Sequence, residues 1–180
     1  MKRAVFLDRD GVINRAMKRD GKPYPPITLG EFEILPEVAT ALVKLKAAGF
    51  LIVVATNQPD VGRGSLARET VDSIHAHMQA KLPIDRVEVC FHPGKGDSDC
   101  DCRKPKPGML LRAAKQLDID LAASWMVGDR WCDIDCGDAA GCKTIFIDRG
   151  YVEALKQKPD FSAHDLGEAA SIILSNLIFL

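Results

Sequence analysis

Short apolar runs alternate along most of the chain with stretches in which apolar residues recur at helical spacing. The apolar runs predict strands over residues 5–7, 50–55, 87–91, 124–127 and 144–147. The helical spacing predicts helices over residues 37–48, 65–82, 107–117, 132–140 and 167–177, with Ser65 as an N-cap. Such an alternation is typical of an α/β fold with a doubly wound parallel sheet and helices on both faces.

Acidic residues follow two of the predicted strands. Asp8 and Asp10 come where the first strand ends, and Asp129 follows the fourth strand, with Asp133 one helical turn later. Two carboxylates at the spacing of Asp8 and Asp10 can share one cation while one attacks and the other moves a proton. Oxygen ligands such as Asp129 suit Mg²⁺, and Asp133 could orient a lysine or a metal-bound water. Taken singly, these acids could also be loop residues or helix caps.

Two further polar segments lie at the same expected edge of the sheet. Thr56 follows the second strand, and its hydroxyl with the neighbouring backbone N–H groups can hold phosphoryl oxygens. Lys104 stands between an arginine and a proline before the third helix, where it would neutralise a phosphoryl group and Asp8. A strand-ending turn and a solvated basic turn are the alternatives when each segment is considered alone. Because ligands bind at the carboxyl ends of parallel strands, the four segments together predict a phosphoryl-transfer site.

Size and charge narrow the class of protein. The 180 residues suit one domain spanning residues 1–180, and the 47 residues between Asp8 and Thr56 leave no room for a separate cap domain. A formal net charge of −1 gives no support for binding nucleic acid or an anionic membrane. No signal-peptide core or spanning segment stands out, so we expect a cytoplasmic protein. A small domain without a cap can work as a monomer, and we expect one.

Four of the metal-ligating side chains form a spaced set. Cys90 and His92 are followed by Cys100 and Cys102, which gives three thiolates and an imidazole in two close pairs. In a reducing compartment this pattern predicts a closed, structural Zn²⁺ site in a loop over residues 90–102. The alternative is four unliganded residues on a polar loop. The remaining cysteines, which we expect to be packing residues, are Cys132, Cys136 and Cys142.

The order and spacing of Asp8-x-Asp10, Thr56, Lys104 and Gly128-Asp129-x-x-x-Asp133 resemble the four motifs of the haloacid dehalogenase superfamily of phosphatases, which have a Rossmann-like sheet. The resemblance implies that Asp8 attacks phosphorus and forms an aspartyl-phosphate. Asp10 would protonate the leaving alkoxide and then activate water, while Thr56 and Lys104 hold the transferring oxygens. Mg²⁺ would be held by the carboxylates of Asp8 and Asp129 and by the backbone carbonyl of Asp10, with Asp133 outside this ligand set.

The zinc-loop pattern before Arg103-Lys104-Pro105 further resembles a subgroup of these phosphatases that acts on heptose bisphosphates or histidinol phosphate. This resemblance implies a small sugar-phosphate substrate, contacted by Arg103 and Arg130, and extends to Asn57 and Gln58 as substrate-binding candidates. A heptose 1,7-bisphosphate losing its 7-phosphate is the favoured reaction. Histidinol phosphate or another small phosphomonoester is the alternative. A zinc-knuckle module for nucleic acid is a remote alternative, because it leaves Asp8, Asp10 and Asp129 without a role.

Overall fold

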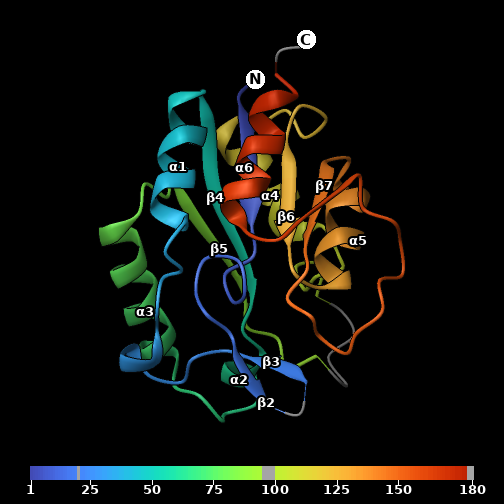
Figure 1. Ribbon diagram of the computed structural model, residues 1–180. Helices are drawn as coiled ribbons and strands as arrows, with labels where there is room; N and C mark the ends of the chain where they lie inside the picture. The colour runs from blue at the N-terminus through green and yellow to red at the C-terminus, as the bar shows by residue number, and fades with distance from the viewer. Residues whose placement is uncertain (20, 95–99, 178–180) are drawn as a thin grey trace.

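The computed structural model describes residues 1–19, 21–94 and 100–177. Its central feature is a six-stranded, all-parallel sheet in the order β5-β4-β1-β6-β7-β8 (Figure 1). The strands are β1 (Arg3–Leu7), β4 (Phe50–Asn57), β5 (Arg86–Cys90), β6 (Trp125–Gly128), β7 (Lys143–Ile147) and β8 (Phe161–Ala163). The parallel sheet predicted from the sequence is therefore confirmed, and β8 is an edge strand that the apolar pattern did not predict.

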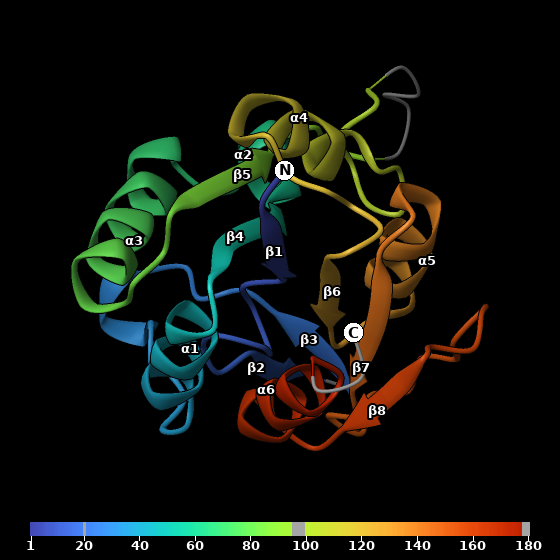
Figure 2. The same ribbon diagram turned by 90° about the horizontal axis from the view of Figure 1, so that it is seen from above.

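Helices cover both faces of this sheet (Figure 2). They are α1 (Val38–Ala47), α3 (Arg68–Lys81), α4 (Gly108–Leu117), α5 (Trp131–Ala140) and α6 (Leu166–Ser175). Side chains alternate across β1, so that Val5 and Leu7 belong to the core under α1 and α6, whereas Phe6 belongs to the core under α4 and α5. A strand buried on both faces explains why its sequence is a continuous apolar run.

One predicted helix begins later than its sequence suggests. The N-cap of α3 is Ala67, and the expected cap, Ser65, donates its hydroxyl to the carbonyl of Asp60 at 3.1 Å. The short helix α2 (Pro59–Gly62) precedes this turn and draws Ser65 into its own C-terminal contacts. The prediction of Ser65 as the N-cap was therefore wrong.

The segment between β1 and α1 forms a small structure over the carboxyl ends of the strands. Strands β2 (Met17–Arg19) and β3 (Lys22–Tyr24) pair as an antiparallel hairpin, and a 3-10 turn, η1 (Leu29–Glu31), follows (Figure 1). Among the described residues, this segment contains no larger element, and the absence of a cap domain stays a prediction. No helix among the described residues is long and apolar enough to cross a membrane.

Candidate active site

The predicted motif residues meet at the carboxyl edge of the sheet. Asp8 leaves β1, Asp129 leaves β6, and Asp133 lies in the first turn of α5. The ammonium of Lys104, on the turn before α4, lies 2.8 Å from Asp8 Oδ1 and 2.6 Å from Asp133 Oδ1. All four side chains are buried. The expected pairing of Lys104 with Asp8 and Asp133 is thus present in the structure.

The three carboxylates of this cluster carry more negative charge than the one lysine among them can balance. Oxygens of Asp8, Asp129 and Asp133 all lie within 4.8 Å of one another, and Lys104 is the cation between them. Burial, opposed by Lys104, raises the pKa of Asp8 to about 6, and burial followed by repulsion from Asp8 and Asp133 raises the pKa of Asp129. For Lys104 burial acts in the opposite direction, but the two carboxylates that it contacts outweigh it and raise the pKa. A divalent cation bound by these oxygens would favour their ionised forms, so the donor set fits Mg²⁺.

The backbone at Gly11 packs tightly against the metal-binding candidates. Its φ is +92°, and a Cβ atom at this position would overlap the carboxylate of Asp129 and lie 2.9 Å from the hydroxyl of Tyr151. Glycine therefore satisfies both a left-handed backbone and a close approach here.

Asp10 is not part of this carboxylate cluster and has its own set of donors. The guanidinium of Arg9 donates to both Asp10 oxygens at 2.9–3.1 Å, Asn14 Nδ2 donates at 3.0 Å and Gln58 Nε2 at 2.9 Å. The Asp10 side chain remains 15% exposed and lines the main cavity of the site. It therefore lies where a carboxyl group can reach a bound substrate. Metal binding by the backbone carbonyl of Asp10 stays a prediction.

The three residues at the end of β4 have distinct positions. Thr56 is buried, lines the cavity and accepts a hydrogen bond from Gln58 Nε2 at 2.9 Å. Asn57 exchanges two hydrogen bonds of 3.1 Å with the backbone of Lys104, which links β4 to the turn that carries the lysine. Gln58 is buried, and its Nε2 donates both to Thr56 and to Asp10. Substrate contacts by Asn57 and Gln58 stay predictions, and the structure gives both residues a positioning contact instead.

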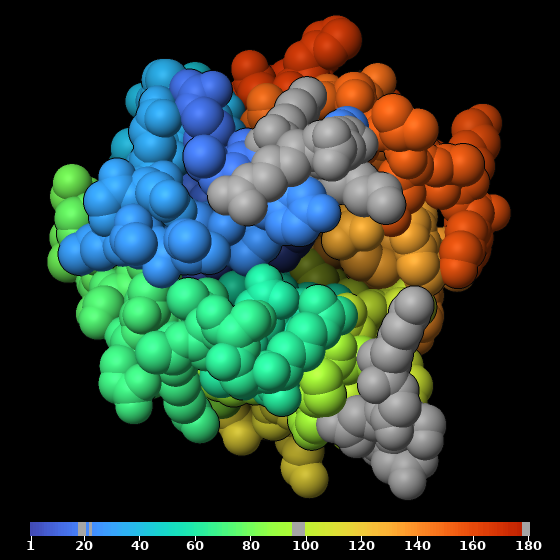
Figure 3. All heavy atoms as spheres, turned by 90° about the horizontal axis from the view of Figure 1, so that it is seen from below, coloured from blue at the N-terminus to red at the C-terminus, as the bar shows by residue number. Residues whose placement is uncertain are grey.

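An open cavity of about 540 Å³ lies above these groups, a size typical of sites for small molecules. It opens on the face drawn in Figure 3, between the N-terminal hairpin segment and the segment around residue 60. Its walls come from the segment after β1, from α2 and the turn that follows it, from the turn before α4 and from the start of α5. The side chains that line it are Asp8, Asp10, Pro23, Tyr24, Pro25, Thr56, Asn57, Pro59, Asp60, Arg63, Arg103, Lys104, Pro105, Arg130, Trp131 and Cys132.

Sequence reasoning missed several residues of this cavity. Arg63 adds a third guanidinium to those of Arg103 and Arg130, and Trp131 forms part of the wall. Arg130 is held by Glu153 through two hydrogen bonds of 2.7 and 2.9 Å, and this pairing lowers the pKa of Glu153. The spacing of Gly-Arg-Gly after the second motif was the available signal for Arg63. The sequence contains no local signal for Glu153, which is 23 residues from its partner.

The predicted zinc ligands converge. The ligating atoms of Cys90, His92, Cys100 and Cys102 all lie within 4.8 Å of one another. His92 Nδ1 lies 3.4 Å from the sulfur of Cys90 and 3.3 Å from that of Cys102. Three thiols and one imidazole at these separations fit a tetrahedral Zn²⁺. Residues 95–99 of the predicted loop lie outside the described residues. The three cysteines expected to be packing residues, Cys132, Cys136 and Cys142, are buried.

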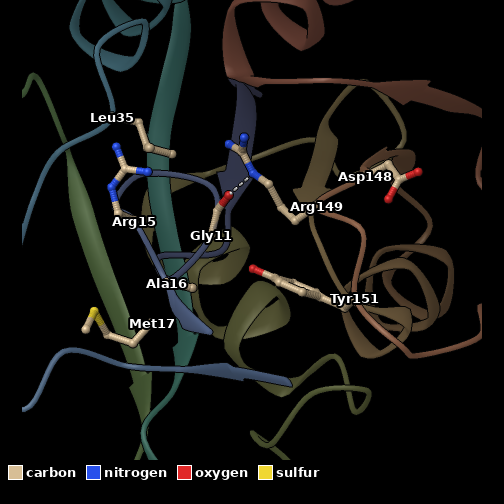
Figure 4. A pocket seen from close by; sticks show the side chains of 8 residues that line it. All are labelled: Gly11, Arg15, Ala16, Met17, Leu35, Asp148, Arg149 and Tyr151. Atoms are coloured by element: carbon tan, nitrogen blue, oxygen red, sulfur yellow. Dashed lines mark hydrogen bonds between the residues drawn. The ribbon is translucent and has the colours of Figure 1, made fainter. Parts of the chain in front are cut away.

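A second cavity, of about 610 Å³, lies behind the Gly11 backbone (Figure 4). Arg149 and Tyr151 enter it from the loop after β7, and Arg149 Nε donates to the Gly11 carbonyl at 2.7 Å. Arg15 and Leu35 form the opposite wall. The loop after β7 therefore supports the turn that places Gly11 against Asp129.

Comparisons with known proteins agree with this geometry. A family model described as HAD-hydrolase-like matches residues 101–169. D-glycero-beta-D-manno-heptose-1,7-bisphosphate 7-phosphatase of Pasteurella multocida is 39% identical over 83% of this chain and 84% of its own, and that of Pseudomonas putida is 36% identical over 86% and 87%. The crystal structure of D,D-heptose 1,7-bisphosphate phosphatase from B. bronchiseptica, complexed with magnesium and phosphate, is 29% identical, with a TM-score of 0.80 over 97% of this chain and 99% of that one. The chain thus belongs to the D-glycero-beta-D-manno-heptose-1,7-bisphosphate 7-phosphatase family of haloacid dehalogenase-like hydrolases.

Proposed function

We propose that this protein is a Mg²⁺-dependent phosphatase that removes the 7-phosphate from D-glycero-beta-D-manno-heptose 1,7-bisphosphate. The observation that carries the reaction type is the cluster of Asp8, Lys104 and Asp133 beside Asp129 at the floor of an open cavity. The names of the relatives at 36–39% identity support the sugar and its anomer. We further propose one cytoplasmic domain that acts as a monomer, since both walls of the cavity come from this one chain.

In the first half of the proposed reaction, a carboxylate oxygen of Asp8 attacks phosphorus and the bond from phosphorus to the sugar oxygen breaks. Asp10 gives its proton to the departing alkoxide, which leaves as the neutral sugar alcohol. In the second half, Asp10 takes a proton from a water molecule that attacks the aspartyl-phosphate, and Asp8 is released with free phosphate. Thr56 and Lys104 hold the oxygens of the transferring group, and their positions at the cavity floor support this role.

Two metal ions belong to the proposal. Mg²⁺ would be held by Asp8, Asp129 and the backbone carbonyl of Asp10, and it would offset the negative charge of nucleophile and phosphate. Asp133 is not a ligand in this proposal, because its carboxylate pairs with the ammonium of Lys104 at 2.6 Å. Zn²⁺ would be held as a structural ion by Cys90, His92, Cys100 and Cys102. Four protein ligands would leave it no open position for a catalytic water.

The second phosphate of a bisphosphate needs cationic partners. Arg103 and Arg130 line the same cavity as Asp8, and Glu153 holds the guanidinium of Arg130 by two hydrogen bonds. An arginine fixed in this way presents its remaining donors at lower entropic cost than a free one. We assign these two arginines to the phosphate on carbon 1.

Phosphate release from a substrate panel tests the function. The panel contains both anomers of the heptose bisphosphate, fructose 1,6-bisphosphate and histidinol phosphate, each assayed with and without Mg²⁺. We expect a preference for the beta anomer that is lost in Asp8→Asn and kept in Asp138→Asn, a matched change at an exposed position of α5. Equal, slow turnover of the whole panel would contradict the heptose assignment, and preference for histidinol phosphate would replace it. No release from any substrate would contradict the phosphatase assignment.

A further inference from the structure

The arginine between the two aspartates is a buried cation with an unusual set of partners. Arg9 has an exposed fraction of 0%, although guanidinium groups are rarely buried completely. Two of its nitrogens, Nε and Nη2, donate to the carboxylate of Asp10. Its third nitrogen, Nη1, lies 3.0 Å from Nε2 of His75. Arg9 therefore connects the proposed proton donor to a histidine on α3, 66 residues further along the chain.

The chemistry of the two groups defines the state of His75. A guanidinium can only donate hydrogen bonds, so Nε2 of His75 must be the acceptor and the ring proton lies on Nδ1. Burial and the neighbouring charge of Arg9 lower the pKa of His75 to about 4, which keeps the ring neutral near pH 7. His75 is 6% exposed and is therefore a fixed acceptor inside the protein.

The acceptor restricts how Arg9 can turn. With Nη1 on His75, the plane of the guanidinium is set, and the edge that carries Nε and Nη2 faces both oxygens of Asp10. Removing the acceptor leaves a buried N–H without a partner, which favours rotation of the guanidinium away from Asp10. Asn14 and Gln58 would still hold the carboxylate, but less firmly.

We propose that His75 is a positioning residue for proton transfer: it fixes Arg9, which in turn fixes the Asp10 carboxyl group toward the leaving oxygen of the substrate. This inference rests on the proposed phosphatase function and adds the residue that orients its acid. A proton donor that is misplaced by a fraction of an ångström loses much of its effect, because proton transfer requires hydrogen-bond contact in the transition state.

The test compares two leaving groups in one protein. Sugar alkoxides need a proton to leave, whereas p-nitrophenolate leaves without one, and kcat/KM reports only the steps up to this departure. His75→Asn is too short to reach Arg9, whereas the amide oxygen of His75→Gln can occupy the position of Nε2. We expect His75→Asn to lower kcat/KM for the heptose bisphosphate by about tenfold or more. For p-nitrophenyl phosphate, kcat/KM should fall by less than about twofold. His75→Gln should restore most of the loss.

Controls separate this role from a structural one. His77 lies on the same helix, packs edge-on to Phe32 at 6.2 Å, and His77→Asn should leave both substrates unchanged. His75→Leu gives a second variant without an acceptor for Arg9 and should behave as His75→Asn does. Equal losses on both substrates, or no loss in a folded His75→Asn protein, would overturn the inference while leaving the phosphatase intact. A wild-type protein that cleaves neither substrate would overturn the proposed function and the inference together.

Discussion

The buried, neutral ring of His75 makes the folded protein sensitive to acid. An ordinary histidine has a pKa of 6.5, whereas burial and Arg9 lower the pKa of folded His75 to about 4. Below pH 6.5 the unfolded chain therefore binds a proton that the folded protein does not, and the free energy of unfolding falls with falling pH. The two pKa values give a loss of about 2 kcal/mol between pH 7.5 and pH 5, with a limit of about 3.4 kcal/mol below the folded pKa.

Urea unfolding at the two pH values measures this loss, with His75→Gln as the reference. Glutamine does not titrate, so the variant should lack the acid-dependent component of His75 while the other titrating groups contribute equally to both proteins. Any hydrogen bond weakened by the substitution shifts the variant by the same amount at both pH values. Wild type should lose about 2 kcal/mol more than His75→Gln on going to pH 5. Equal losses would refute the idea that His75 is held neutral by its surroundings.

Three further changes test other parts of the site. Gly11→Ala should lower kcat/KM by more than about 100-fold, because the new Cβ overlaps Asp129. Gly49→Ala, with φ +86° and nothing within 4 Å of its Cβ, should share the backbone cost of about 1 kcal/mol but keep full activity. Glu153→Gln should raise KM for the bisphosphate about three- to tenfold, since Arg130 loses its ionic partner, without changing KM for p-nitrophenyl phosphate. A zinc-selective chelator in excess Mg²⁺ should lower Tm by more than about 5 °C in a scanning calorimeter, and added Zn²⁺ should restore it.

The sheet and the cluster at its edge were predictable because their signals are local. The central strands are continuous apolar runs, since residues such as Phe6 and Leu7 pack on opposite faces of a covered sheet. Parallel strands bring their carboxyl ends to one edge, so side chains that follow two strands must meet. This is why Asp8 and Asp129 could be placed together from their positions alone.

The remaining features depend on contacts that no local pattern records. The hairpin of β2 and β3 has only three residues in each strand, too few for a period to be read. Ser65 has the residue type and position of an N-cap, but its hydroxyl donates instead to the carbonyl of Asp60 in α2, a helix that the sequence did not predict. His75 lies two residues from His77 on one helix and therefore on a different face, and nothing in the local pattern indicates its partner. That partner is Arg9, 66 residues away in the sequence.

The same contacts explain how two aspartates separated by one residue can have different roles. Asp8 accepts from Lys104 and lies beside the carboxylates of Asp129 and Asp133, where a bound cation can neutralise it. Asp10 is not part of that cluster and accepts from Arg9 and from the neutral amides of Asn14 and Gln58. Each carboxylate thus has a cation of its own, and the two cations do not share a partner among the described contacts. A nucleophile has to stay ionised, whereas an acid–base group has to gain and lose a proton within one turnover. Different cationic partners for the two aspartates meet both requirements. Arg9 lies between Asp8 and Asp10 in the sequence, but its side chain donates only to Asp10, which leaves Lys104 as the cation that contacts Asp8.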